Sequence, residues 1–203
     1  MNSISTAERQ LLFDFITSST SISNDLFAQI IQLFKKKTFK KGDFILKEGD
    51  IETFSNIVVE GVVHQYTYEE DQPITINITP KGFSFNNLKS YITKTPSLEV
   101  HEAITDVELM CITRKDIDAL MRKSHEFSYL MFKIYENILL DRENRMFLLQ
   151  VKNPTKRYRL FHEIVERADK ILDDSPDKYI ASYLNMTPQQ YSNEKKKMLK
   201  GQL

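Results

Sequence analysis

Near the end of the chain, the stretch YIASYLNMTPQQYSNEKKK gathers side chains that could recognise and hold a nucleic acid. Gln189 and Asn193 carry amides, which can both donate to and accept from the edge of adenine in the major groove. Lys195, Lys196 and Lys197 carry charges that can neutralise backbone phosphates. A lysine run is also typical of a solvated helix end, so these side chains need an element that aims them.

The spacing within this stretch predicts two helices joined by a tight turn. Ala181 supplies the small residue needed where two helices cross closely, and Asn185 tolerates the left-handed backbone of a turn. Thr187 then caps a second helix that begins at Pro188, where no backbone N–H is needed. The inner faces are apolar at Ile180, Leu184, Met186 and Tyr191. The pattern is typical of a helix-turn-helix whose second helix enters the major groove. The candidate DNA-binding residues are Thr187, Gln189, Ser192, Asn193, Lys195, Lys196 and Lys197.

Composition and charge restrict the class of protein. The 203 residues are 41% hydrophobic and 28% charged, which is typical of a globular protein with one large or two small domains. No apolar run reaches the roughly 20 residues that span a bilayer, and the N-terminus lacks a signal-peptide pattern. We therefore expect a cytoplasmic protein without a membrane partner. Residues from Val151 onward carry 11 Lys and Arg against 7 Asp and Glu, a net charge of +4 that favours a basic partner-binding module.

Two periodicities alternate along the chain and predict an α+β fold. Apolar residues recur at helical spacing from about Ser5 to Lys37. From Thr38 onward, short runs rich in Val, Ile, Thr, Tyr and Phe alternate with turns that contain Gly or Pro, which is typical of an antiparallel barrel or sandwich. A second β stretch, HEAITDVELMCIT, precedes a return to helical spacing at Arg114, and a further helix is expected after Pro154.

Residues from Glu126 to Gln150 predict one long helix with a broad apolar stripe. A helix of this length in a small domain usually leaves part of its stripe for a partner. We therefore expect a dimer helix, with Leu130, Ile134, Ile138 and Met146 at the interface between two copies of the chain. The alternative is that the whole stripe packs on the chain's own β domain.

The order of these parts and their local sequence motifs resemble those of the Crp/Fnr-type transcription regulators. KKGDFILKEGD followed by NIVVEGVV is similar to the first strands and glycine corners of that family's β-roll, and KYIASYLNMTPQQYS resembles the helix-turn-helix of one of its branches. The resemblance covers roughly Leu33 to Met198. It implies a homodimer with three parts. These are a cyclic-nucleotide-binding-like antiparallel β-roll (a double-stranded β-helix) with flanking helices over 1–125, a dimerisation helix over 126–150, and a small helix-turn-helix domain over 151–203.

The segment that would hold a cyclic nucleotide departs from the family. Relatives that bind one carry a Gly-Glu pair for the ribose hydroxyl and, about ten residues later, an Arg for the cyclic phosphate. Here these positions are Asn86-Asn87 and a residue near Ser97, with no Arg or Lys after Lys94 in that segment. A phosphate buried without a cation is poorly compensated. We therefore expect that cyclic AMP and cyclic GMP do not bind in the family's manner, and that the effector is another small molecule or none.

No set of residues is suited to a cofactor or to catalysis. One cysteine excludes the iron–sulfur centre of the family's oxygen-sensing branch, and Cys111 lies in a strand-like run that predicts a core position. The histidines are too scattered to nominate a haem ligand or to form the closely spaced set of a metal-binding cupin. These residues are His64, His101, His125 and His162. We expect no cofactor, no metal site, no catalytic residue and no enzyme activity.

The reading helix also departs from the family, whose base-contacting positions typically hold Arg, Glu and Arg. Here these positions are Pro188, Gln189 and Asn193, which removes the commonest guanine contacts and favours an A/T-rich palindromic site. The sequence stops shortly after Lys200, so we expect the family's β-hairpin wing to be missing. Two hypotheses remain: a dimeric DNA-binding regulator with a sensor β-roll, or a ligand-sensing or protein-interaction β-roll with a vestigial helix-turn-helix.

Overall fold

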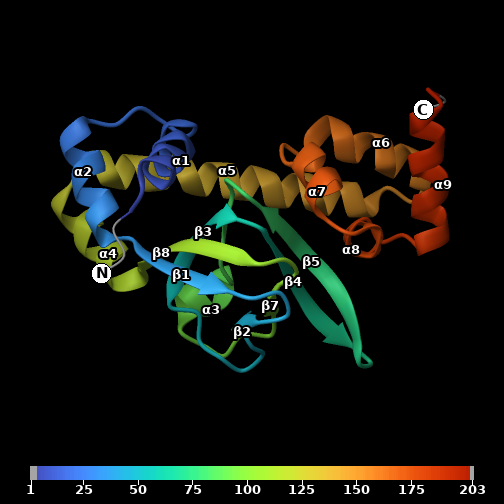
Figure 1. Ribbon diagram of the computed structural model, residues 1–203, viewed down its shortest axis with the longest axis horizontal. Coiled ribbons are helices and arrows are strands. Elements are labelled where there is room, and N and C mark those ends of the chain that lie inside the picture. Colours follow the sequence, from blue (N-terminus) through green and yellow to red (C-terminus); the bar gives the residue numbers. More distant parts are fainter. Residues whose placement is uncertain (1–3, 202–203) are drawn as a thin grey trace.

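The computed structural model describes residues 4–201 and has an α+β fold. Figure 1 shows a β-roll beside one long helix, with smaller helices gathered at both ends of that helix. The strands are β1 (Lys35–Phe39), β2 (Phe44–Leu46), β3 (Phe54–Glu60), β4 (Val62–Glu69), β5 (Gln72–Pro80), β6 (Ser84–Phe85), β7 (Val100–Ala103) and β8 (Val107–Thr113). The helices are α1 (Thr6–Thr17), α2 (Asn24–Leu33), α3 (Leu88–Thr93), α4 (Arg114–Lys123), α5 (His125–Gln150), α6 (Pro154–Ile164), α7 (Ala168–Asp174), α8 (Asp177–Tyr183) and α9 (Pro188–Leu199).

Two four-stranded antiparallel sheets form the β-roll. Sheet A has the strand order β1-β8-β3-β6, and sheet B has the order β2-β7-β4-β5. Side chains from both sheets form an apolar core, which we call the inner core: Val58, Val63, Phe85, Ala103, Val107, Leu109 and Cys111. Burial raises the pKa of the Cys111 thiol to about 12, which keeps it protonated and unreactive. The predicted core position of Cys111 is confirmed.

Helices α1, α2 and α4 and the first half of α5 cover the outer face of sheet A. Alternate residues of the sheet, such as Ile57 and Met110, point outward and join these helices in a second apolar cluster. Side-chain caps define the helix starts. Ser5 and Glu8 form a capping box at α1, and Ser23 caps α2 while its hydroxyl donates to Glu126 of α5 (2.8 Å).

The second half of α5 and the helices α6–α9 form a third apolar cluster that reaches onto sheet B. We call it the C-terminal core. Val62, Ile78 and Ile104 from the β-roll belong to it, together with Leu148 from α5. Its other members come from α6–α9 and the turns between them: Tyr158, Phe161, Val165, Ala168, Ile171, Ile180, Ala181, Tyr183, Leu184, Met186 and Tyr191. Figure 1 shows α7 and α8 lying beside β5, in agreement with this packing.

The predicted α+β fold with an antiparallel β-roll is confirmed, and the boundaries differ at two places. β1 begins at Lys35, three residues before the predicted Thr38. The sequence pattern places the start too late because the three lysines at the beginning of the strand show no apolar alternation. The helix predicted after Pro154 is two helices, α6 and α7, because Val165 leaves the helix to enter the C-terminal core. Within residues 4–201, no helix is both long and apolar enough to cross a bilayer.

The corner between β3 and β4 generates a prediction about Gly61. Its φ is +83°, and a Cβ at this position would lie 2.1 Å from the backbone oxygen of Asp106. Gly61→Ala therefore combines backbone strain with a clash against main chain, and we expect it to lower the free energy of unfolding by at least about 3 kcal/mol in urea denaturation. Gly49→Ala is the matched control, because Gly49 has a φ of +89° and nothing within 4 Å of its Cβ position. It should cost only about 1–2 kcal/mol. Equal losses at the two glycines would contradict the clash.

Candidate nucleic-acid interface and sensor region

Helix α8, the turn Leu184–Thr187 and helix α9 form one packed unit, the α8–α9 unit. Ala181 is buried in the C-terminal core where α8 meets α9. Asn185 has a φ of +48°, in the left-handed region, and lets the chain reverse. The Thr187 hydroxyl accepts from the Gln190 N–H (3.2 Å), and the Gln190 side chain accepts from the Thr187 N–H (3.0 Å), which completes a capping box. The predicted left-handed backbone at Asn185 and the predicted cap at Thr187 are confirmed, and Ala181 is buried at 1% exposure.

A buried arginine on α6 holds this turn in place. Arg157 is only 7% exposed, and its Nη1 donates to the carbonyls of Leu184 (2.7 Å) and Asn185 (2.8 Å). Its Nη2 donates to the carbonyl of Lys152, at the end of α5 (3.3 Å). Carbonyls left open where α8 ends thus gain a charged donor. Nothing in the local sequence pattern identifies Arg157, because its partners in the turn lie 27 and 28 residues away.

Helix α9 presents a polar face to solvent while Tyr191 anchors its other face in the C-terminal core. Gln189 and Asn193 are both exposed, and the Gln189 Nε2 donates to the Asn193 Oδ1 (3.0 Å). Ser192 lies beside them and is half-buried. The structure therefore brings three of the predicted DNA-binding residues together on the exposed part of α9.

The three predicted lysines differ in how free they are. Lys195 pairs with Asp177 of α8 (2.8 Å), and Lys197 pairs with the buried Glu194 (2.7 Å). Lys196 is exposed and forms no salt bridge within residues 4–201. Of the three predicted lysines, Lys196 therefore carries the positive charge most available to a partner.

The residues predicted at an effector pocket lie around α3, where two of them have structural partners. Asn87 is 4% exposed and caps α3, since its Oδ1 accepts from the Ser90 N–H (2.7 Å). Ser97 is 2% exposed, and its hydroxyl accepts from the Glu99 N–H (2.9 Å). Asn86 instead lines a cavity on the outer side of sheet A. The three residues therefore do not face one common pocket.

Within the β-roll, the polar groups that surround His101 are carboxyl and amide groups. His101 is fully buried, with its Nε2 3.3 Å from a Glu99 carboxylate oxygen and 3.2 Å from the Gln65 amide nitrogen. Its Nδ1 lies 3.8 Å from a carboxylate oxygen of Glu52, whose pKa is raised by burial. A phosphate beside His101 would meet the carboxyl groups of Glu52 and Glu99.

The α8–α9 unit docks on β5, the edge strand of sheet B. The Thr75 N–H donates to the Ser182 hydroxyl of α8 (3.1 Å), which satisfies an edge-strand donor. Arg145 of α5 donates to the Thr75 carbonyl (3.2 Å), and its guanidinium lies 3.7 Å from the centre of the Tyr183 ring. Burial lowers the pKa of Arg145 to about 10, so it remains cationic at neutral pH.

One amide connects the interior of the β-roll to the C-terminal helices. The Asn77 Nδ2 donates to the Gln65 Oε1 (3.0 Å), beside His101, while its Oδ1 accepts from Arg167 (2.8 Å). Arg167 also donates to Asp141 of α5 (2.9 Å). Asn77 is thus a joint between the β-roll, α5 and the segment that precedes α7.

Acid should weaken the docking of α8 through His64. This side chain is 3% exposed, its ring centre lies 4.5 Å from that of Tyr179, and burial together with the charge of Lys178 lowers its pKa to about 4. The unfolded chain binds the same proton near pH 6.5, so this stabilisation is complete above pH 6.5 and is lost as the pH falls toward 4. Urea denaturation should show a loss of about 2 kcal/mol between pH 7 and pH 5 from this group.

The matched variants for this pH dependence are His64→Gln and His125→Gln. His64→Gln removes the buried ring and should reduce the loss between pH 7 and pH 5 by about 2 kcal/mol. His125 is exposed at the start of α5, so His125→Gln should leave the pH dependence unchanged. A His64→Gln variant with the pH dependence of the parent protein would rule out a buried neutral histidine.

Comparison with known proteins agrees with this architecture. Residues 36–124, from β1 to the end of α4, match the family model of the cyclic nucleotide-binding domain. No curated protein matches the chain in sequence.

Solved structures share the fold over most of the chain at low sequence identity. FixK2 from Bradyrhizobium japonicum has a TM-score of 0.68 at 17% identity, over 83% of this chain and 86% of that one. A CooA mutant from Carboxydothermus hydrogenoformans has a TM-score of 0.64 at 18% identity, over 85% and 79%. The Thermus thermophilus catabolite activator protein has a TM-score of 0.54 at 17% identity, over 90% and 86%. The chain therefore has the fold of the Crp/Fnr-type regulators, and the resemblance predicted from sequence is confirmed at that level.

Proposed function

We propose that the protein is a dimeric DNA-binding transcription regulator of Crp/Fnr type, with α8–α9 as its helix-turn-helix and α9 as the reading helix. The observation that carries the proposal is the exposed pair Gln189 and Asn193 on a capped helix whose opposite face is fixed in the C-terminal core. A rigid helix with polar outward side chains suits the major groove. Lys196 supplies a phosphate contact beside it.

The pairing of the two amides supports the reading of adenine. The Gln189 Nε2 is engaged with the Asn193 Oδ1 (3.0 Å), which leaves the Gln189 Oε1 as an acceptor and the Asn193 Nδ2 as a donor. Adenine presents the complementary groups, the N6 donor and the N7 acceptor, in the major groove. The missing Arg residues remove guanine contacts, so an A/T-rich palindromic site fits this face. The net charge of +4 from Val151 onward adds non-specific attraction to DNA.

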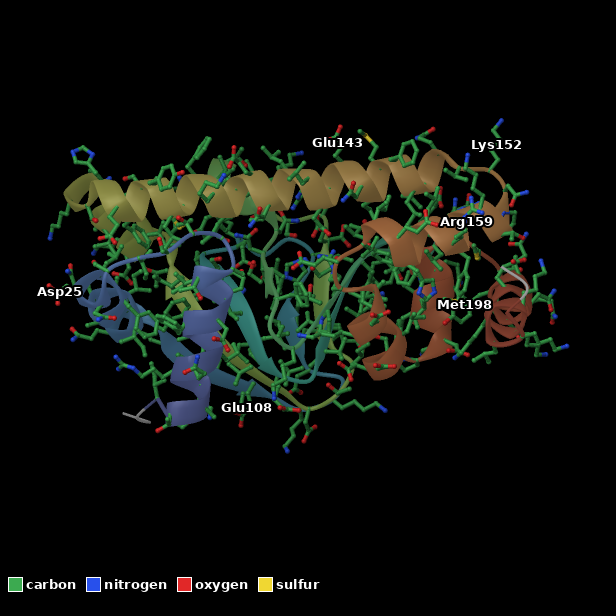
Figure 2. The ribbon with its side chains drawn as sticks, turned by 90° about the horizontal axis from the view of Figure 1, so that it is seen from above. Asp25, Glu108, Glu143, Lys152, Arg159 and Met198 are labelled. Atoms are coloured by element: carbon green, nitrogen blue, oxygen red, sulfur yellow. The ribbon has the colours of Figure 1, made fainter. Side chains whose placement is uncertain are left out.

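The dimer contact in this proposal is the outer face of α5. Two of the residues predicted there face the chain's own β-roll: Leu130 is 1% exposed in the apolar cluster on the outer face of sheet A, and Ile134 packs on that cluster. Ile138 lines a cavity, and Met146 is 62% exposed. The four do not share a surface, because α5 is apolar on both sides. Its exposed apolar residues are Tyr129, Phe132, Leu139, Leu140, Met146, Phe147 and Leu149. Figure 2 shows Glu143 of the same helix pointing away from the body of the molecule.

The spacing of this outer face supports pairing with a second copy. Phe132, Leu139 and Met146 recur at seven-residue spacing, so they form a row along one side of α5, with Glu136 and Glu143 at the alternate heptad positions. Large exposed apolar side chains along one side of a helix are unfavourable in water. We therefore propose α5 as a dimer helix that uses this row.

We propose further that the β-roll does not bind a cyclic nucleotide in the way that the family's cyclic-nucleotide-binding members do. Asn87 and Ser97 are engaged in local hydrogen bonds at the expected ribose and phosphate positions. Carboxyl groups of Glu52 and Glu99 flank His101 within the roll. The effector is then a different small molecule, or there is none.

The second hypothesis is a β-roll used for ligand sensing or protein interaction, with a helix-turn-helix that no longer binds DNA. This hypothesis is favoured by the base-contacting positions, which hold Pro188, Gln189 and Asn193 and therefore no Arg. The two hypotheses differ in one measurable property, the affinity of the protein for DNA.

DNA binding should be measured by fluorescence anisotropy after selection of sites from a random-sequence pool. Asn193→Ala should weaken binding to the selected A/T-rich site about tenfold, because a paired base contact is worth about 1–3 kcal/mol. Lys196→Ala should weaken binding to all sequences alike and reduce the slope of log affinity against log salt by about 1. The control is Lys115→Ala on α4, which Figure 1 shows at the opposite end of the molecule from α9. If no site binds more tightly than random DNA at low salt, the second hypothesis replaces the first.

Leu139→Glu should convert the protein toward monomers, as measured by sedimentation equilibrium. The change places a carboxylate of each copy in an apolar contact, and we expect the dimer dissociation constant to rise at least tenfold. Leu98→Glu is the matched control, since Leu98 and Leu139 are both 63% exposed and Leu98 lies outside α5. A dimer that tolerates Leu139→Glu as well as Leu98→Glu would place the interface elsewhere.

A further inference from the structure

A cavity lies between the outer face of sheet A and the helices that cover it. Its volume is about 60 Å³, and it is partly open to solvent. Its walls come from α1, α2, α3, α4, α5 and sheet A. The lining residues that the following steps use are Ser55, Asn86, Tyr91, Ile134, Tyr135 and Ile138.

This cavity is separate from the space between the two sheets. Neighbouring residues on a strand point to opposite faces of a sheet. On β3, Ile57 lines the cavity and belongs to the cluster under the helices, whereas Val58 belongs to the inner core. On β8, Ile112 lines the cavity and Cys111 belongs to the inner core. A ligand here would therefore not occupy the interior of the roll.

The chemistry of the lining selects an uncharged molecule. Most lining side chains are aliphatic or aromatic, and none of those described carries a charge at neutral pH. A small number of polar groups, from serines, Asn86 and two tyrosines, stand among them. An apolar pocket with a few polar groups is the usual design of a small-molecule site. A charged ligand would lose its hydration here, and none of the described lining side chains would supply a counter-ion.

One polar group in the lining has no partner. Tyr91 of α3 is 2% exposed, and its hydroxyl forms no hydrogen bond within the described residues. Burial raises the pKa of this phenol, so the hydroxyl keeps its proton and remains a donor. A buried donor without an acceptor is unfavourable, and a bound acceptor would relieve that cost.

We propose that this cavity binds a small, uncharged molecule with an apolar body and one hydrogen-bond acceptor, to which the Tyr91 hydroxyl donates. The apolar body lies against Ile134 and Ile138 of α5. Such a ligand contacts α3 and α5 at once, and it stabilises the arrangement of these two helices. Its role as an effector rests on the proposed regulator function, but its binding does not.

The test uses a homologous series of methyl ketones, from acetone to 2-heptanone, titrated onto the full-length protein in a calorimeter. Each ketone has the same acceptor, and each added CH₂ increases the apolar surface that the cavity can bury. We expect saturable binding that tightens about fourfold per CH₂ until the cavity is filled and then levels off. Absence of saturable binding throughout the series would overturn the proposal.

Two variants locate the bound ketone. Ile134→Trp fills the cavity and should abolish binding, whereas Leu98→Trp makes the same kind of change at an exposed position outside the cavity and should leave binding intact. Tyr91→Phe should weaken 2-pentanone about fivefold and leave n-pentane unchanged, because only the ketone has an acceptor. Unchanged ketone affinity in Tyr91→Phe would overturn the assigned donor. If Ile134→Trp fails to fold, the ketone series and Tyr91→Phe still decide.

The ligand site and the regulator function can fail separately. Selected DNA that binds the protein while no ketone binds removes the ligand site and leaves the regulator proposal in place. Saturable ketone binding without specific DNA binding keeps the ligand site and removes its role as a transcriptional effector. Both results come from the same protein preparation by calorimetry and anisotropy.

Discussion

The packing of α5 against both halves of the molecule sets the geometry of all other parts. Leu130 lies in the cluster under sheet A, and Leu148 lies in the C-terminal core. Their separation along the helix is about 27 Å at 1.5 Å per residue. Because both ends are buried, α5 acts as a stiff rod whose position relative to the β-roll also fixes the position of α8 and α9.

The β-roll matches the cyclic nucleotide-binding domain over residues 36–124, and its buried polar side chains form a network of carboxyl, imidazole and amide groups. His101 lies between the carboxyl groups of Glu52 and Glu99, and Gln65 continues the network toward Asn77. The Arg167 Nη2 then donates to the Asn77 Oδ1 from the other side (2.8 Å). Asn77 bonds Gln65 on one side and Arg167 on the other, so we expect a change at Gln65 to disturb the contact with Arg167. Double-mutant cycles would measure the coupling energy along these contacts.

The parts of the structure that follow local rules could be predicted from sequence. Asn185 and Thr187 are fixed by backbone conformation and helix capping, which depend on a few neighbouring residues. The antiparallel strands likewise follow from alternation and glycine corners. The division of α5 into an inner and an outer face could not be predicted. Apolar residues surround the helix, so its periodicity does not distinguish the buried Leu130 from the exposed Met146.

The long-range contacts could not be predicted from the sequence for a different reason. Arg157 and Asn77 find their partners through the tertiary fold, and their residue types are common on exposed surfaces. A free hydroxyl such as that of Tyr91 becomes notable only once its burial is known. Sites of this kind are defined by what is missing around a group, and a sequence pattern does not contain that information.

The C-terminal core has a consequence for how the molecule unfolds. Val62, Ile78 and Ile104 on sheet B are covered by the same cluster that contains the centres of α6 and α8. Loss of the C-terminal helices would expose that face of the roll to water, and loss of sheet B would remove the floor on which those helices rest. The boundary between the β part and the helical part of the sequence is therefore crossed by a shared apolar cluster. We therefore expect the face of sheet B that carries Val62 and Ile78 to become exposed to solvent when helices α6–α9 unfold.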